Sequence, residues 1–297
     1  MPQRIPGVGI LLSIGLLWGM SVVMHTACVV AQPARSVQGG TTAFYENRGQ
    51  IADGAGHMAR EVAYHADFGN VRVYVTREGW YTAYYSVADA APDAVSEATG
   101  RAGDRNGARE PRLGGEREAA RVHRLGVLFE GSDPDVEITA EYRVQEYRNY
   151  YMGHCPEGIT HVPGYRVLRF RNLYEHIDLL LYAAREGLKY EVEVRPGGRV
   201  ADIRLRYEGT PGIDRQPDGG LRTSWPGGYT QEQPPYAYQR AASAGSTGPC
   251  AVDASYRVEG NTVGFSVGVH DPTTELVIDP WSTYYGGIDL DHAYRIA

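Results

Sequence analysis

The chain has 297 residues, of which 42% are hydrophobic, so it can bury a sizeable core and global disorder is excluded. Its 29 Lys and Arg residues stand against 36 Asp and Glu residues, for a net charge of -7. The cationic residues are scattered among acids, and this acidic balance excludes nucleic acid as a partner. Lys189 is the only lysine, so the other basic residues are arginines. The length corresponds to about two domains or to one large β domain.

The first residues have the pattern of a signal peptide. Arg4 precedes an apolar run from Val8 to Val23, which is short for a membrane span of ~20 residues. Val29 and Ala31 supply small residues at positions -3 and -1 of a cleavage site. We therefore expect residues 1–31 to be removed after Ala31, which leaves no transmembrane segment in the mature chain. An uncleaved anchor helix is the alternative.

The three cysteines raise two separate questions. Thr26-Ala27-Cys28 resembles the end of a lipoprotein cleavage box, so anchoring through a lipid on Cys28 is a minor alternative, against which His25 argues. If Cys28 leaves with the signal peptide, Cys155 and Cys250 remain, and export predicts that they pair. Two free thiols are the competing interpretation.

The mature chain begins with a strand-rich segment, from Phe44 to Val87. Within it, Val71–Thr76 alternates apolar and polar residues, Glu78-Gly79 marks a turn, and Trp80–Tyr85 resumes the alternation. This pattern predicts a β-hairpin.

Residues 88–121 differ from their surroundings. They are rich in Ala, Gly, Asp, Glu and Arg and contain no aromatic residue. Such a segment cannot bury enough apolar surface to offset its ordering entropy, so it is predicted to be a flexible insertion. A sub-boundary between two domains is placed near 122–148.

Strand patterns return from Val122. The clearest, Leu188–Arg195, alternates apolar and charged residues, which predicts one buried and one wet face. Val258 and Val263 flank Glu259-Gly260-Asn261, a second hairpin signal. Further strands are expected at 127–129, 136–138, 165–170, 177–182, 203–208 and 276–278. Many short strands without helical periodicity predict an all-β, antiparallel β-sandwich-type fold.

Several segments, spread from residue 44 to residue 280, carry a family resemblance. They are Phe44–Gln50, Asn149–Gly153, Val162–Tyr165, Leu173-Tyr174, Ile177–Leu179, Leu188–Glu191, Pro234–Tyr236, Tyr238-Gln239 and Leu276–Pro280. Together they resemble the N-terminal domain of unknown function that precedes β-propeller-type SBBP repeats in bacterial surface proteins. The sequence departs from that family at Glu175-His176, at Cys155 and at Gly287–Asp291.

The resemblance implies the domain organisation. Residues 32–281 would form the exported β-rich domain, and 282–297 would start the first repeat, which makes the chain a fragment or a truncated product. It also implies a non-catalytic cell-surface module with a structural or adhesive role, no cofactor, and an extracellular glycan or surface protein as partner. The alternative is a secreted carbohydrate-binding module or carbohydrate-active enzyme.

No catalytic, cofactor or metal site is predicted. Glu175, His176 and Asp178 mix metal-ligand types, but zinc needs three or four ligands, so Asp178 is expected to accept hydrogen bonds from backbone donors at a strand entry. Asp289 and Asp291 lack the remaining ligands of a calcium loop. The tyrosines that could form a sugar-stacking platform are Tyr150, Tyr151, Tyr229, Tyr236 and Tyr238, and ordinary half-buried strand positions are the favoured interpretation.

Overall fold

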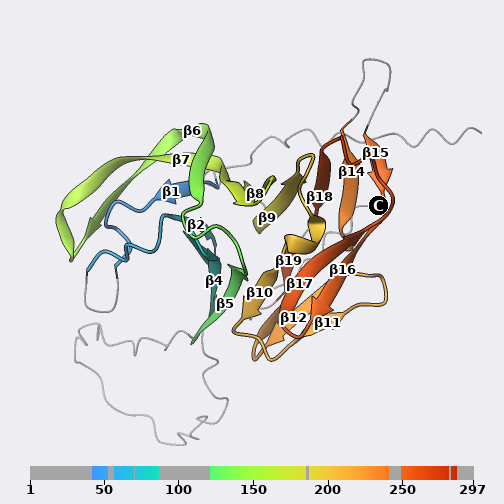
Figure 1. Cartoon of the computed structure of the whole chain (residues 1–297). Helices are drawn as coiled ribbons and strands as arrows, with labels where there is room; N and C mark the ends of the chain where they lie inside the picture. Colours follow the sequence, from blue (N-terminus) through green and yellow to red (C-terminus); the bar gives the residue numbers. More distant parts are fainter. Residues whose placement is uncertain are drawn as a thin grey trace, which may run out of the picture. The chain divides into compact units, whose positions relative to one another are not determined.

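The computed structural model describes residues 42–52, 57–69, 71–86, 121–184, 187–240 and 249–280, together with the backbone of 282–285. All of them belong to one unit, Gly40–Ala297. The described residues are built from antiparallel strands and one 3-10 turn, Val200–Asp202, as Figure 1 shows. The all-β, antiparallel prediction is therefore confirmed. No helix among the described residues is long and apolar enough to cross a bilayer.

The strands differ widely in length. They are β1 (Phe44–Glu46), β2 (Tyr64–Phe68), β3 (Val71–Thr76), β4 (Gly79–Ser86), β5 (Arg121–Phe129), β6 (Glu137–Met152), β7 (Cys155–Tyr174), β8 (Ile177–Ala184), β9 (Gly187–Val194), β10 (Leu205–Glu208), β11 (Ile213–Arg215), β12 (Leu221–Trp225), β13 (Gly228–Glu232), β14 (Tyr236–Gln239), β15 (Cys250–Val252), β16 (Ala254–Glu259), β17 (Thr262–Val267), β18 (Leu276–Asp279) and β19 (Ser282–Tyr285).

Most strands belong to one large sheet. Its order is β15-β14-β18-β9-β8-β7-β1-β2-β3-β4-β5-β10-β17-β16, and β6 pairs with β7 outside this path. Only Asp253 separates β15 from β16, so the two ends of the order are successive pieces of chain. A second sheet has the order β11-β12-β13-β19.

The main core joins strands that are distant in the sheet order. Trp80 of β4 lies 5.6 Å from Tyr190 of β9 between ring centroids, and Phe129 of β5 lies 5.1 Å from Phe170 of β7. All four side chains belong to one buried cluster. Because a fully buried side chain of this size contributes roughly 1.5–3 kcal/mol, such contacts stabilise the packing of β4 and β5 against β7 and β9.

Both predicted hairpins are present. β3 pairs with β4 from Val71 to Thr76, although the turn residues are Arg77 and Glu78 and Gly79 already belongs to β4. β16 pairs with β17 around Gly260-Asn261. The expected short strand at 136–138 is instead the start of the long β6, because β6 and β7 pair along most of their lengths.

Gly79 shows where the sheet demands glycine. Its φ is +147°, and a Cβ there would lie 2.1 Å from the carbonyl oxygen of Val127. Gly131 also has a positive φ, +73°, but a Cβ there would meet nothing within 4 Å. We expect Gly131→Ala to cost about 1 kcal/mol from φ strain alone and Gly79→Ala about 2 kcal/mol, because the backbone must also shift. Urea unfolding of both variants measures the difference, and equal costs would contradict the steric account.

Candidate functional site

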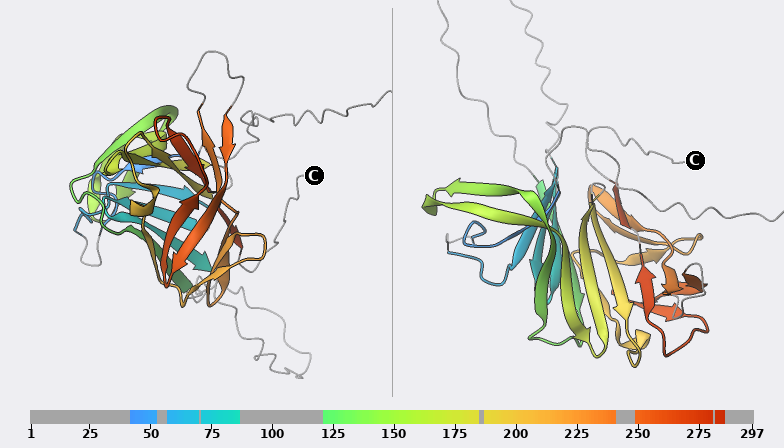
Figure 2. Two further views of the ribbon diagram at one scale, coloured as in Figure 1. Left: turned by 45° about the vertical axis from the view of Figure 1, so that its right-hand side comes forward. Right: turned by 90° about the horizontal axis from the view of Figure 1, so that it is seen from above.

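The long hairpin of β6 and β7 carries many exposed side chains, most of them on β6. Figures 1 and 2 show the two strands as a pair of long antiparallel ribbons. We call residues 142–165 the β6–β7 arm. Its pairing shifts register three times, between Arg143 and Met152, and Tyr142 and His161 adopt positive φ angles of 55° and 56°. Such bulges twist a strand pair and re-aim its side chains.

Aromatic side chains are concentrated on the arm. Of the eight exposed large hydrophobic side chains among the described residues, four lie on β6: Tyr142, Tyr147, Tyr151 and Met152. The Tyr147 ring stacks on His161 at 4.7 Å between centroids. The Tyr151 ring lies over Gly158, where a Cβ would come within 2.5 Å of it. These rings are therefore held against β7 while one side of each stays accessible, as a recognition surface requires.

A buried histidine lies beneath the arm. His65 of β2 is only 2% exposed. Its Nε2 lies 3.2 Å from the Tyr150 hydroxyl oxygen and 3.4 Å from Gln50 Nε2, and its ring lies 6.0 Å from the Tyr45 ring. Nδ1 of His65 is buried and has no hydrogen-bond partner. Burial, followed by the charges of Arg148 and Arg72, lowers the pKa of His65 to about 4, against the opposing effect of Asp67.

An ion-pair network fixes the arm beside His65. Asp67 accepts hydrogen bonds of 2.6 Å from both Arg72 and Arg148. Burial raises the pKa of Asp67, but the two guanidinium groups outweigh burial and leave the pKa below its usual value. Arg148 also places its guanidinium 4.2 Å from the centre of the Tyr45 ring. The arm is thus attached to β1 and β2 by charge-assisted hydrogen bonds and a cation–π contact.

Asn47 orders the loop that completes this cluster. Its side-chain amide donates to the carbonyl oxygens of Ala59 and Val62, and its oxygen accepts from the N–H groups of Gly49 and Ile51. All four hydrogen-bonding positions of an asparagine side chain are therefore used. The structure brings together three of the segments that carry the family resemblance: Phe44–Gln50, Asn149–Gly153 and Val162–Tyr165.

Asp178 has the hydrogen bonds expected of it. Its Oδ1 accepts from the N–H of Asn172 at 2.8 Å and from Arg195 at 3.1 Å, which confirms the interpretation as a strand-entry acceptor. Glu175 and His176 form the turn before β8, and His176 has a φ of 60°, so neither has the strand orientation assumed in the sequence argument. Among the described residues, no group of three or more His, Cys, Asp or Glu could hold a metal ion.

The wet face predicted for Leu188–Arg195 is wrong. Glu191 and Glu193 are 8% and 7% exposed. Arg169 of β7 lies 2.5 Å from Glu193, and Arg240 lies 3.0 Å from Glu193 and 3.7 Å from Glu191. The carboxylates alternate with apolar residues as predicted, but long arginine side chains reach over from β7 and from the residue after β14 and cover them.

The tyrosines of the proposed sugar platform do not form one surface. Tyr150 and Tyr151 lie on β6, and Tyr229 lies on β13 of the second sheet, 4.2 Å from the Arg222 guanidinium. Tyr236 and Tyr238 of β14 stack at 5.6 Å between centroids, and Tyr236 is exposed. Two separate aromatic surfaces are therefore available, one on the arm and one on β14.

The predicted disulfide is not formed in the structure, where both thiols are free. Cys155 begins β7, and Cys250 begins β15 at the end of the sheet order. Four strands, β8, β9, β18 and β14, stand between β7 and β15 in that order. The two cysteines therefore lie on strands that are not paired with each other.

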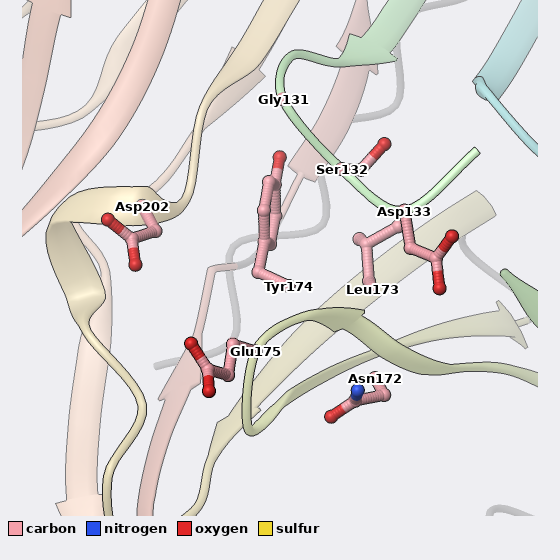
Figure 3. Close-up of a pocket in the computed structure, with 8 residues that line it drawn as sticks. All are labelled: Gly131, Ser132, Asp133, Asn172, Leu173, Tyr174, Glu175 and Asp202. Carbon is pink, nitrogen blue, oxygen red and sulfur yellow. The ribbon is translucent and has the colours of Figure 1, made fainter. Parts of the chain in front are cut away.

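A hollow of about 380 Å³ lies beside Tyr174. Figure 3 shows the residues that line it. Its lining includes the carboxylates of Asp133, Glu175 and Asp202, and the Glu175 and Asp202 side chains lie on the other side of Tyr174 from Asp133. The Tyr174 hydroxyl donates to the carbonyl oxygen of Arg204 at 3.0 Å. The hollow therefore offers acceptors but little apolar area for binding a substrate.

Several sequence predictions fall outside the described residues. These are the signal peptide with cleavage after Ala31, lipidation at Cys28, nearly all of the insertion at 88–121, and the pair Asp289 and Asp291. Of the predicted repeat start at 282–297, the structure describes the backbone of Ser282–Tyr285, which forms β19 and pairs with β13.

Sequence reasoning missed His65 and the buried ion pairs. His65 stands in the run Tyr64-His65-Ala66-Asp67, where nothing distinguishes a buried imidazole from an exposed one. For the ion pairs, the one signal in the sequence was that Lys189 is the only lysine. The structure places its Nζ 2.8 Å from Asp279 Oδ1.

Comparison with known proteins gives a family but no described relative. No curated protein and no solved structure matches the chain. The family described as Domain of unknown function (DUF7948) matches residues 44–281. That match does not connect the chain to the SBBP-repeat proteins, so this part of the resemblance stays a prediction. Because the match covers most of the sequence, the chain belongs to the DUF7948 family.

Proposed function

We propose that this protein is a non-catalytic, exported surface module with a structural or adhesive role, and that the β6–β7 arm is its contact surface. The observation that carries the proposal is the group of exposed side chains on β6: Tyr142, Tyr147, Tyr151 and Met152. Tyrosine presents a large contact area at low entropic cost, and exposed aromatic groups of this kind mark interaction sites. The partner class is an extracellular glycan or surface protein.

The proposal extends to the architecture. The large sheet and the second sheet together form a β-sandwich-type domain. This domain precedes a β-propeller-type repeat array. Pairing of β19 with β13 supports this view, because it connects the segment after the family match to the domain by backbone hydrogen bonds. Further copies of Ser-Thr-Tyr-x-Gly-Gly encoded downstream would support the array, and a native stop codon directly after Ala297 would count against it. Export predicts a mature protein that begins at Gln32, which N-terminal sequencing tests.

Three substitutions on the arm test the contact surface. We expect the combined variant Tyr142→Ser, Tyr147→Ser and Tyr151→Ser to lose binding by about tenfold or more, because exposed aromatic anchors carry most of the energy of such contacts. The measurement is retention on a glycan array and on a panel of immobilised extracellular proteins. Tyr236→Ser, at a position on β14 about as exposed as Tyr147, is the control and should retain binding.

A secreted carbohydrate-binding module or carbohydrate-active enzyme is the second candidate. The stacked Tyr236 and Tyr238 favour glycan binding on β14, and the carboxylates at the hollow near Tyr174 favour hydrolysis. Loss of glycan binding in Tyr236→Ser but not in the arm variant would favour the binding module. Glycan hydrolysis that disappears in Glu175→Gln or Asp202→Asn would favour the enzyme.

A further inference from the structure

The only lysine of the chain has an unusual environment. Lys189 of β9 places its Nζ 2.8 Å from Oδ1 and 2.9 Å from Oδ2 of Asp279, on the neighbouring strand β18. Oδ1 is buried, and the lysine does not approach it along a hydrogen-bonding direction. Elsewhere the described ion pairs of this sheet use arginine, which cannot lose its proton and act as a nucleophile. A lysine amine can.

A third group completes the arrangement. β9 and β18 pair with Ile278 opposite Val192, and continuing this register places Asp279 opposite Glu191. Glu191 lies two residues from Lys189 and therefore projects from the same face of β9. It is buried, and its Oε2 accepts from the Tyr182 hydroxyl at 3.3 Å. Burial, with the nearby Asp279 charge, raises the pKa of Glu191 against the opposing charges of Lys189 and Arg240.

We propose that Lys189 and Asp279 form an intramolecular amide bond, with Glu191 as the proton carrier. The Lys189 ammonium first gives one proton to the Asp279 carboxylate. The resulting amine then attacks Cγ of Asp279, so a C–N bond forms and one C–O bond breaks. Glu191 takes a proton from the attacking amine and delivers it to the leaving oxygen, which departs as water. An ammonium and a carboxylate thus become one neutral amide and one water, and no oxidant, metal or cofactor takes part.

The surroundings favour the product over the ion pair. Tyr182 stands beside Lys189 on β8, with its ring centre 5.7 Å from Nζ, and shields one side of the pair. A shielded ion pair has lost much of its hydration, whereas a neutral amide requires little. Both groups sit on paired strands, which supplies the proximity that an intramolecular reaction needs.

The bond would lock the last strand of the family match into the sheet. It joins residues 90 positions apart in the chain, and β18 precedes the strand β19 that leaves the matched region. A covalent tie between β9 and β18 would keep β18 from peeling off the sheet under tension, which hydrogen bonds alone resist less well. This inference stands on the site geometry and does not depend on the proposed function.

Tryptic mapping of the folded full chain by mass spectrometry tests the bond. Trypsin does not cleave at an acylated lysine or at the Arg195–Pro196 bond, so the linked product joins the peptide that spans 186–199 to the peptide that spans 258–295. We expect this pair at the summed peptide masses less one water. Asp218-Gly219 can also lose one water, by forming a succinimide. If the water loss is found only there and the linked peptides are absent, the proposal is overturned. So would recovery of unlinked Lys189 after prolonged incubation at neutral pH.

Matched variants make the result specific. Lys189→Arg keeps the positive charge beside Asp279 but cannot form the bond, so it should fold and lose the linked pair. Asp279→Asn can close the same bond with loss of ammonia, and its linked pair should have the same mass as that of the unaltered chain. Glu191→Gln should lower the linked fraction at least tenfold, and an unchanged fraction would overturn the role of Glu191. A linked pair that persists in Lys189→Arg would overturn the assignment to Lys189.

Discussion

Glu232→Ala is expected to lower the free energy of unfolding by about 4 kcal/mol, because it leaves buried hydroxyl groups without an acceptor. Glu232 of β13 is 4% exposed and accepts hydrogen bonds from three buried tyrosines: Tyr207, Tyr190 at 3.1 Å and Tyr256 at 3.3 Å. Tyr256 also donates to the Gln233 carbonyl oxygen, so the Tyr190 and Tyr207 hydroxyls, which also interact with each other, depend most on Glu232. The carboxyl connects the second sheet to β9, β10 and β16 of the first.

Glu232→Gln separates hydrogen bonding from charge. The amide oxygen can accept from Tyr190 and Tyr256, as Oε2 does, and the amide NH2 can donate to the hydroxyl oxygen of Tyr207. We therefore expect this variant to unfold within about 1 kcal/mol of the unaltered protein at neutral pH. Burial raises the pKa of Glu232 although the three tyrosine hydroxyls oppose this effect. The stabilising contribution of the protonated carboxyl is therefore full below the unfolded pKa and declines as the pH rises through the folded value. Urea unfolding measures the free energy of unfolding of both variants. If Glu232→Gln loses as much of it as Glu232→Ala, the charge of the carboxylate is essential and hydrogen bonding alone is not enough.

The sequence predicted the positions of the strands better than the burial and the partners of their side chains. The alternation in Val71–Thr76 and the turn before Trp80 located a hairpin because strand periodicity and turn residues are local properties. Glu191 and Glu193 also obey the alternation, yet their burial depends on Arg169 and Arg240, which lie far away in the chain. The same limit applies to the carboxyl of Glu232, whose three tyrosine partners come from three different strands.

The cysteines and the arm show a second limit of sequence reasoning. An even number of cysteines says nothing about their separation, which is set by the strand order between β7 and β15. The extent of the arm was hidden because the register shifts between Arg143 and Met152 interrupt the alternation that identifies a strand. The site residues that could be found in advance were those with local signals, such as Asp178 at a strand entry and the singular Lys189.

The arm should separate from β1 and β2 in acid, because His65 must then carry a charge in a buried position. Its folded pKa is about 4, below the usual histidine pKa of 6.5. Its stabilising contribution is therefore complete above the unfolded pKa and is lost as the pH falls from 6.5 toward 4. The expected loss of unfolding free energy is about 3 kcal/mol across this window. Glu232 acts in the opposite direction, so the contribution of His65 must be isolated by substitution.

His65→Gln provides that isolation, since glutamine fills a similar volume and does not titrate. Urea unfolding at pH 7.5 and 4.5 should show a smaller acid loss in His65→Gln than in the unaltered protein, by about 2–3 kcal/mol. His154→Gln, at an exposed position on the same arm, is the control and should keep the full pH dependence. Amide exchange should locate the change in residues 142–165 before β8 and β9 respond, because the protonated ring faces Tyr150 and Arg148 of the arm directly. Identical acid losses in His65→Gln and the unaltered protein would assign the sensitivity to another group.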